Sequence, residues 1–450
     1  NMMKHTLLIS TLLLPCLAMA AVSEDQAAQL GQSLTPIGAE KAGNGDNSIP
    51  AWDGGQTELP AGYEEGKKHV NPFAADEMLF EITAQNVAQH EDKLSQGQIA
   101  LFKQFPESYR MKVYPTRRSA VFPQWLYEAT QKNATRVNLT ENGSGFTGTV
   151  RGFPFPIPQN GREVMWNHMA RYFTTGLRGH VNHAVTTRGG DYVVERAKYE
   201  IAFHYNHPDT TLENFNNKNL YVLRKIVSPP SKAGDANLLH VPMDRSKGDT
   251  VVYQYNPGQR KVIRIGEVGY DNPAQDGLIT HDQIDMFNGP MDRYQFKLLG
   301  KREMYVPYNS YDLYSDKLEY DDLIKPGHIN QDHVRHELHR MWVVEATRLP
   351  NVSHIYSKRI FYIDEDSWLI LLQDIYDDRG EFWRTSITHA ITYYNIPLVA
   401  NPVQVHYDLQ SRRYVILNMT NEEKDPLEYD WHEPPSYFST GKLREFATRR

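Results

Sequence analysis

The string His333-Val-Arg-His336-Glu337-Leu-His339-Arg340 has residue types suited to metal binding or acid–base chemistry. Its spacing is not that of a zinc helix, in which two histidines lie one turn apart on one face. On a strand, Glu337 and His339 share one face, and His336 and Arg340 share the other. Two histidines and a glutamate could ligate zinc, but Arg335 between them would repel the cation or pair with Glu337. We therefore interpret His336, Glu337, His339 and Arg340 as a polar hydrogen-bond network, and predict neither a metal nor a cofactor.

Carboxylates form a second group: Asp364-Glu365-Asp366 at a turn, followed by Asp374, Asp377 and Asp378. Paired carboxylates can hydrolyse glycosidic bonds when about 5 Å or more separates them. Aspartates are also common in turns, because their side chains bond to nearby backbone. The chain contains no Gly-x-Ser-x-Gly nucleophile motif and no phosphate-binding loop. We predict no catalytic residues and no enzyme, with a hydrolase using Asp, Glu or His as the alternative.

Apolar residues indicate a different kind of site. The segments 354–364 and 367–377 have the period of strands but are apolar on both faces, so both faces must be covered. One of the two faces could line the interior of a curved sheet, where a cavity would hold an apolar ligand. The expected lining of such a cavity is Trp342, Val344, Phe361, Trp368, Ile370, Leu372 and Tyr393. An ordinary packed core has the same composition and remains open for each of them.

These residues belong to a long β region that begins near residue 191. Period-two patterns predict strands at 191–205, 219–228, 235–243, 249–256, 260–266, 296–306, 334–348, 354–364, 367–377, 382–394, 402–408 and 413–418. Short connections such as Asn256-Pro257-Gly258-Gln259 require antiparallel neighbours. The sequence therefore predicts an α+β protein whose large curved antiparallel sheet has about 11–12 strands.

Residues 21–190 read as helices and loops that pack on the sheet, so that 21–190 and 191–450 form one combined domain. Ser23-x-x-Gln26 and Ser95-x-x-Gln98 predict helix starts, the first helix running to about residue 34. Pro123 opens another helix, and 161–172 is a further one. Gly176 to Gly179 are interpreted as loop glycines, and 152–158 as a stiff proline-rich arm. A helical insertion is expected from Thr280 to Phe287.

Residues 1–20 have a basic start, an apolar run and the small-x-small site Ala18-Met19-Ala20, which is typical of a secretory signal peptide. Cys16, the single cysteine, lies inside it, so the mature protein is expected to have no thiol or disulfide. These features favour the periplasm of a Gram-negative bacterium. The net charge of −7 is spread along the chain without a basic cluster, which excludes nucleic acid as a partner.

Several strings resemble a bacterial family, the domain of unknown function 1329. They include Tyr255-Asn-Pro-Gly-Gln-Arg-Lys-Val262, Phe287-Asn-Gly-Pro-Met-Asp-Arg-Tyr294, residues 300–311, 335–347 and 361–368, and, upstream, 113–119 and 153–158. Lys261 departs from the arginine that is usual there but keeps its charge. The resemblance implies a fold like that of LolA and LolB, a periplasmic half-barrel capped by helices, and a label as an outer-membrane lipoprotein-sorting protein. It supplies no catalytic residues.

The expected function is a periplasmic carrier or chaperone that binds lipid or other hydrophobic molecules. The resemblance further implies an inner-membrane exporter of the resistance-nodulation-division (RND, MmpL-like) type and an outer-membrane partner, with the outer membrane as the destination. A structural adaptor that carries nothing is the second alternative, beside the hydrolase.

Overall fold

The computed structural model describes residues 21–266 and 269–449, and the expected signal peptide lies outside them. The helices are α1 (Glu24–Ala27), α2 (Gln96–Gln104), α3 (Gln124–Arg136), α4 (Gly161–Met169), α5 (Tyr320–Leu323) and α6 (Thr440–Thr448). In the described residues, no helix has both the length and the apolar character needed to cross a membrane.

Twelve strands coincide with the predicted ones: β6 (Tyr192–Phe203), β7 (Lys218–Ser228), β8 (Ala236–Pro242), β9 (Val251–Asn256), β10 (Lys261–Ile265), β13 (Tyr294–Pro307), β14 (Arg335–Arg348), β15 (Lys358–Asp364), β16 (Ile370–Tyr376), β17 (Phe382–Tyr393), β18 (Leu398–Asp408) and β19 (Arg413–Met419). The others are β1 (Phe80–Ile82), β2 (Met111–Val113), β3 (Asn138–Leu139), β4 (Phe146–Thr147), β5 (Gly176–Thr186), β11 (Pro273–Ala274), β12 (Ile279–Thr280) and β20 (Glu428–Tyr429).

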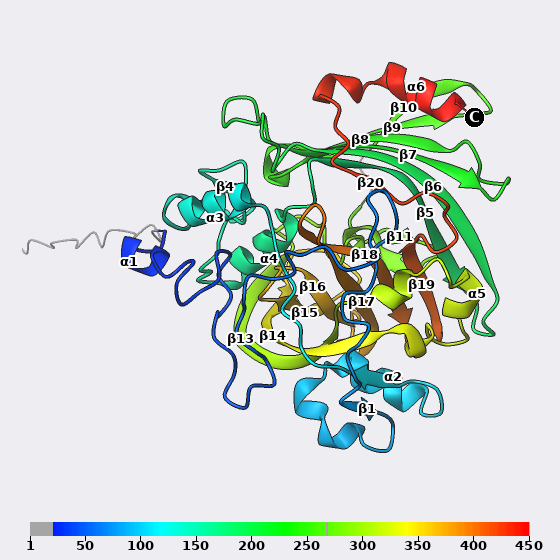
Figure 1. Ribbon diagram of the computed structural model, residues 1–450. Helices are drawn as coiled ribbons and strands as arrows, with labels where there is room; N and C mark the ends of the chain where they lie inside the picture. Colours follow the sequence, from blue (N-terminus) through cyan, green and yellow to red (C-terminus); the bar gives the residue numbers. More distant parts are fainter. Residues whose placement is uncertain (1–20, 267–268, 450) are drawn as a thin grey trace, which may run out of the picture.

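Sixteen of these strands form one open sheet in the order β1-β2-β14-β15-β16-β17-β18-β19-β5-β6-β7-β8-β9-β10, with β13 on β14 and β20 on β5. Figure 1 shows this sheet curling around the centre of the molecule. Its pairs are antiparallel apart from β2 with β14, which is parallel. The predicted α+β class and the large curved antiparallel sheet are confirmed, and the sheet does not close into a barrel.

The capping signals are confirmed at the helix starts, but two lengths were wrong. Ser23 forms the expected capping box, yet α1 has only four residues. Ser95 and Gln98 form the same box at α2. The insertion after Thr280 is a single 3-10 turn, His281–Gln283, whose cap is again a Thr280–Gln283 box. A box therefore fixes where a helical turn begins, but the packing that follows decides how long it runs.

Gly176 and Gly179 are not loop glycines, which corrects the prediction. They lie in β5, which pairs with β6 along its whole length and with β19. An added Cβ at Gly176 would collide with the Trp431 carbonyl oxygen, so the strand needs glycine for close approach by the C-terminal segment.

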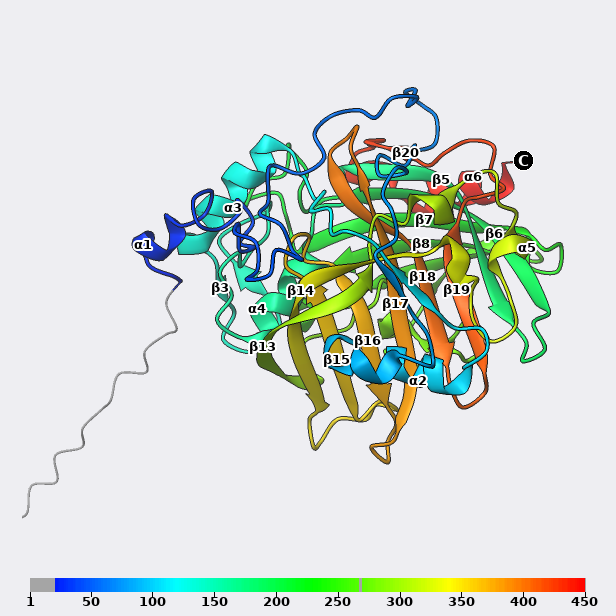
Figure 2. The same ribbon diagram turned by 60° about the horizontal axis from the view of Figure 1, so that its bottom comes forward.

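Both faces of the central strands are covered, as the two-sided apolar pattern requires. One row of cross-strand partners, Phe361, Gln373, Ser386, His406, Val415, Val185 and Val193, defines what we call the Phe361 face, from β15 to β6. The opposite face of the same strands, which we call the Asp374 face, is covered by α2, which crosses β16 and β17 in Figure 2.

A glycine allows α2 to lie against the Asp374 face. The Gly97 N–H donates to the Asp374 carboxylate (2.9 Å), and an added Cβ at Gly97 would collide with Thr385 Oγ1. We expect Gly97→Ala to lower the free energy of unfolding by about 1–3 kcal/mol, because the core there is already full. Chemical denaturation monitored by circular dichroism measures this change.

Gly441 is the matched control, since it is also the second residue of a nine-residue helix, α6. The nearest atom to its added Cβ is Ser439 Oγ at 3.9 Å, so alanine fits. Gly441→Ala should raise the free energy of unfolding by about 0.4–1 kcal/mol. Equal effects of the two substitutions would contradict the assigned packing of α2.

Candidate functional site

The Phe361 face over β15 to β19 is covered by the chain itself. We call residues 278–291 the cover segment. Its Asp282 accepts hydrogen bonds from His354 Nε2 (2.7 Å) and Arg359 Nη1 (2.9 Å). Burial alone would raise the pKa of Asp282, but Arg359 and His354 outweigh it and lower the pKa to about 2. Phe287 packs its ring 5.4 Å from that of Phe361, so the segment is held by charge and by aromatic packing.

The structure separates the seven residues that were expected to line a cavity. Val344 and Phe361 are cross-strand partners, and Trp368 stacks on Trp342 at 6.0 Å. Ile370 and Leu372 are fully buried. Leu372 lies on the Asp374 face, since its cross-strand partner Tyr362 donates a hydrogen bond from its hydroxyl to Asp374. Tyr393 lies in another aromatic cluster, stacked on His69 at 4.3 Å. Their role as a lining stays a prediction.

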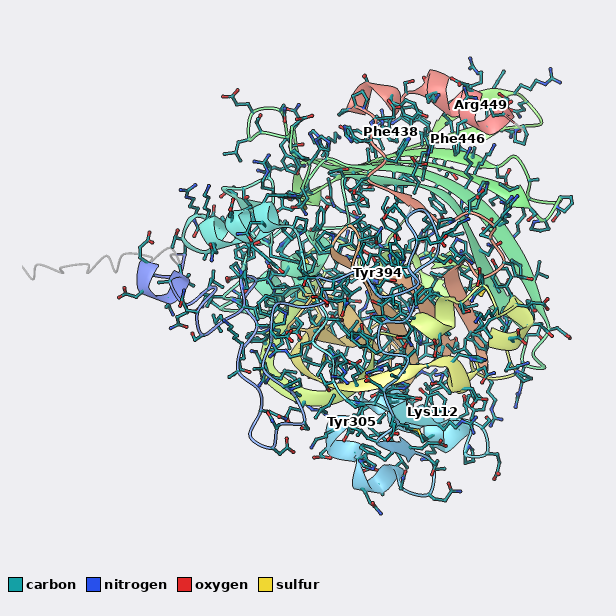
Figure 3. All side chains as sticks on the ribbon, in the orientation of Figure 1. Lys112, Tyr305, Tyr394, Phe438, Phe446 and Arg449 are labelled. Carbon is teal, nitrogen blue, oxygen red and sulfur yellow. The ribbon has the colours of Figure 1, made fainter. Side chains whose placement is uncertain are left out.

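The cover ends at β5. The hairpin of β11 and β12 packs Leu278 and Ile279 on Val415 and Val185, whereas Val193, the partner of Val185 on β6, is 65% exposed. From β7 to β10 the sheet is covered by α6 on its other face, where Phe438 and Phe446 pack on Leu223 and Leu238 (Figure 3).

On the face of this part of the sheet that α6 does not cover, one row of cross-strand partners is entirely aliphatic. We call it the apolar row: Leu177, Ile201, Val222, Leu239, Val252 and Ile265, one from each of β5 to β10. Phe203, Leu220 and Val241 form a shorter row beside it. Leu177 and Val222 are buried and Ile201, Leu239, Val252 and Ile265 are half-buried, whereas Leu223 and Leu238 beneath α6 are 0% exposed. The four half-buried members leave a continuous strip of partly accessible apolar surface across β8 to β10, with Ile201 on β6.

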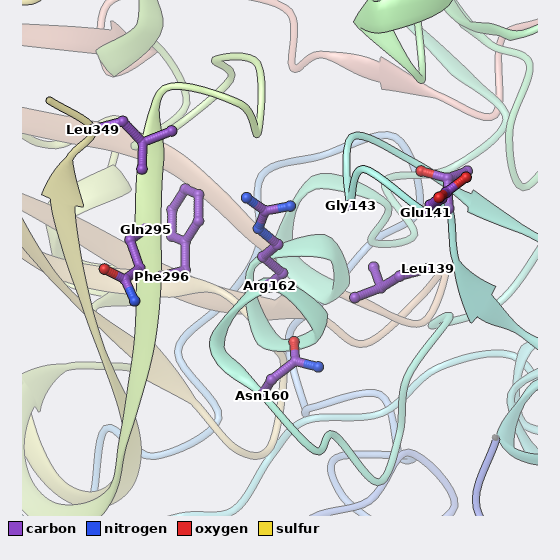
Figure 4. Close-up of a pocket in the computed structure, with 9 residues that line it drawn as sticks. Leu139, Glu141, Gly143, Asn160, Arg162, Gln295, Phe296 and Leu349 are labelled. Carbon is purple, nitrogen blue, oxygen red and sulfur yellow. The ribbon is translucent and has the colours of Figure 1, made fainter. Parts of the chain in front are cut away.

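A pocket of about 330 Å³ lies between α4 and β13. Figure 4 shows Arg162 of α4 at its centre, with Gln295 and Phe296 of β13 on one side and the turn at Gly143 on the other. Leu139 and Leu349 complete its apolar wall. The pocket thus combines a cation with aliphatic and aromatic carbon.

The polar residues expected from the sequence lie elsewhere, in a buried ionic network. Glu337 Oε1 bonds to His339 Nε2 (3.0 Å), and Asp364 Oδ1 bonds to His339 Nδ1 (3.1 Å). Arg340 pairs with Glu365 at 2.9 Å. His336 is buried apart from them, with its Nδ1 unpartnered.

Sequence reasoning missed the N-terminal half of this network. Arg118 bonds to Asp366 through Nε and Nη2, at 3.1 and 2.8 Å, and Asp76 bonds to Arg335 Nη2 at 2.7 Å. The ion pairs form two sets, each with three acids and three bases: Asp76, Glu337 and Asp364 with Arg117, Arg335 and His339, and Glu40, Glu365 and Asp366 with Arg118, Lys301 and Arg340. The two sets adjoin where His339, Asp364 and Asp366 have side-chain atoms within 4.8 Å of one another. The charges balance when His339 is protonated, so the network ties residues 40–118 to the sheet.

The network is poorly suited to acid–base chemistry or metal binding. Burial alone would lower the pKa of His339, but Asp364 and Glu337 outweigh it and raise the pKa to about 10. Both imidazole nitrogens therefore carry a proton and donate to carboxylates, so neither can act as a base. His339, Asp364 and Asp366 have ligand atoms within 4.8 Å of one another, but those of Asp366 already bind Arg118.

Comparison with known proteins gives a family and distant structural likenesses. The family model described as "Protein of unknown function (DUF1329)" matches residues 81–444. An uncharacterized protein of Pseudomonas aeruginosa is 44% identical over 447 residues, covering 99% of this chain and 98% of that protein.

Three solved structures are similar over part of the chain. A candidate outer membrane lipoprotein-sorting protein domain from Vibrio parahaemolyticus has a TM-score of 0.43 at 14% identity, covering 63% of this chain and 97% of that one. A DUF1329 family protein from Desulfovibrio piger has a TM-score of 0.40 at 13% identity, covering 60% and 92%. A LolA superfamily protein from Nitrosomonas europaea has a TM-score of 0.38 at 13% identity, covering 63% and 99%.

Proposed function

Because the chain belongs to the DUF1329 family, whose function its description leaves open, we propose that it is a carrier of lipid-like hydrophobic molecules. The observation that supports the proposal most is the apolar row on the face of β5–β10 that α6 does not cover. A single acyl chain lying along this row is the occupant that we propose.

The length of the row fits an acyl chain. Six neighbouring strands at about 4.8 Å spacing give a row of about 24 Å. One acyl layer of a membrane is half of the hydrocarbon core, which is about 30 Å thick. The row can therefore accompany a lipid chain along its whole length.

The chemistry of the surface also suits this occupant. From β5 to β9 the backbone N–H and C=O groups are used in ladders with a strand on each side, so this part of the row presents side-chain carbon to the ligand. Each methylene that leaves water contributes about 0.8 kcal/mol. A chain that keeps one side in water gains only part of this energy, which permits the release that a carrier needs.

Binding of a fluorescently labelled fatty acid tests the proposal. Leu239 is half-buried at the middle of the row, between Val222 and Val252, so Leu239→Glu places a carboxylate under the bound chain. We expect affinity to fall at least 10-fold, because the charge would lose water when the chain binds. Fluorescence titration measures the change.

Leu212→Glu is the matched control, because Leu212 is 67% exposed in a loop outside the row. It should bind the fatty acid as the unmodified protein does, and both variants should keep the same denaturation midpoint. A protein that binds no fatty acid, or binds it equally well after Leu239→Glu, would contradict the proposal.

The setting that we propose is the periplasm, where the carrier would take cargo from an RND-type exporter of the inner membrane and pass it toward the outer membrane. The leader-like residues 1–20 and the family resemblance support this setting. Carriage requires no catalytic group, and the proposal assigns none.

A further inference from the structure

The pocket between α4 and β13 contains a cation whose side chain lacks a matching carboxylate. Arg162 Nη1 donates to the Asn142 carbonyl oxygen at 2.6 Å. Within residues 21–266 and 269–449, this carbonyl is its hydrogen-bond acceptor, and Asp292 is the carboxylate that acts on it electrostatically, without a direct ion pair. A guanidinium has five N–H groups, so most of them are available to a ligand.

The turn beside Arg162 is shaped to admit the guanidinium. Gly143 has φ +69°, and an added Cβ there would collide with Arg162 Nη1. Burial lowers the pKa of Arg162, and the carboxylate of Asp292 acts in the opposite direction without outweighing it. Glu141 also lines the pocket, but its side chain is exposed to solvent.

The rest of the pocket is suited to the part of an amphiphile that adjoins its charged end. Phe296 and Leu349 supply apolar contact, and the Gln295 amide supplies a donor and an acceptor. Phe296 continues into the covered interior, since its ring lies 6.1 Å from that of Phe287. A small ion would leave these carbon surfaces without a partner.

The pocket also adjoins the strands that carry the apolar row. Its turn continues to Gly145, where an added Cβ would lie 2.6 Å from Asp244 Oδ2. Asp244 follows β8 and is bonded to Asn217, which precedes β7. Leu220 and Val241 lie at this same end of β7 and β8.

We infer that the Arg162 pocket binds the anionic end of the cargo, a carboxylate or a phosphate attached to an apolar chain. This inference rests on the proposed function, because it takes the apolar row as the site of the chain. A guanidinium can hold either group through two parallel hydrogen bonds.

Chain-matched ligands test it. Hexadecanoate and monohexadecyl phosphate carry the charge, and hexadecanol has the same chain without it. We expect the full chain to bind at least one anionic ligand about 10-fold more tightly than hexadecanol, as measured by displacement of a fluorescent fatty acid. The anionic ligand whose affinity exceeds that of hexadecanol by the larger factor identifies the headgroup, carboxylate or phosphate.

Arg162→Gln should remove this preference by weakening the anionic ligands about 10-fold, and it should leave hexadecanol binding unchanged. Arg162→Lys keeps the charge and should retain part of the preference. Arg188→Gln removes an equal charge from an exposed turn and should change nothing. Denaturation midpoints confirm that each variant is folded.

The outcomes separate the two proposals. Equal binding of anionic and neutral ligands, or an unchanged preference after Arg162→Gln, would overturn this inference and leave the carrier function standing. Failure of all three ligands to bind the unmodified protein would overturn both.

Discussion

Replacement of Arg118 by methionine should lower the free energy of unfolding by about 3–5 kcal/mol. Its guanidinium is buried, binds Asp366 through two nitrogens and donates to the carbonyl oxygens of Glu40, Lys41 and Pro50. Methionine fills similar space but leaves a buried carboxylate without its cation, which is the costly way to break a buried ion pair. Urea denaturation at neutral pH measures the loss.

The same substitution has a pH signature. Burial alone would raise the pKa of Asp366, and Arg118 is the main group that holds it below its ordinary value. Without Arg118 this pKa should rise, so part of the lost stability should return as the pH is lowered and Asp366 takes up a proton.

Arg178→Met is the matched control for Arg118. Arg178 pairs with Glu428 at 2.7 Å, but the two side chains are 46% and 54% exposed. Exposed pairs contribute about 0–1 kcal/mol, so this variant should change stability little. Similar losses in the two variants would show that the buried network does not connect residues 40–118 to the sheet as described.

Stability should also fall as the pH rises from about 6.5 to about 10, because of His339. Its pKa is raised to about 10 in the folded protein, and an unfolded histidine has a pKa near 6.5. The folded state therefore holds a proton that the unfolded chain releases above pH 6.5. This contribution is fully present below pH 6.5 and is lost as the pH passes through about 10.

The expected slope approaches about 1.4 kcal/mol per pH unit in this interval, and several kcal/mol are at stake over the whole range. Urea denaturation between pH 6 and 9.5 measures it. His339→Gln removes the titrating group, so its stability should change much less over the same interval. An NMR titration that gave His339 an ordinary pKa would contradict the prediction independently of folding.

The strands were predictable because their signals are local. In β15 and β16, side chains alternate between faces, and the absence of a polar face indicated that both were covered. β5 was not predicted because its two glycines suggest a loop. Its pairing with β19 joins residues more than 200 positions apart, which no local pattern can show.

The candidate sites also contain some residues that a local string indicated and others that only the fold brings together. The His336–Arg340 string indicated a polar network, but Arg118 and Asp76, which complete it, have no neighbouring motif that would connect them to it. The apolar row takes one residue from each of six strands, so each member alone is an ordinary strand residue. Arg162 is likewise an ordinary helix residue until the turn at Gly143 and β13 approach it.

The sequence by itself determined the sheet class, twelve of the strands, the starts of α1 to α4 and the family resemblance, because periodicity, capping and motif strings act within a few residues. Only the tertiary structure decided which faces are covered. The chain covers the Phe361 face over β15 to β19 with residues 278–291, whereas α6 covers the opposite face of β7 to β10. Burial depends on which distant segments pack together, and that is a property of the folded chain rather than of any segment in it.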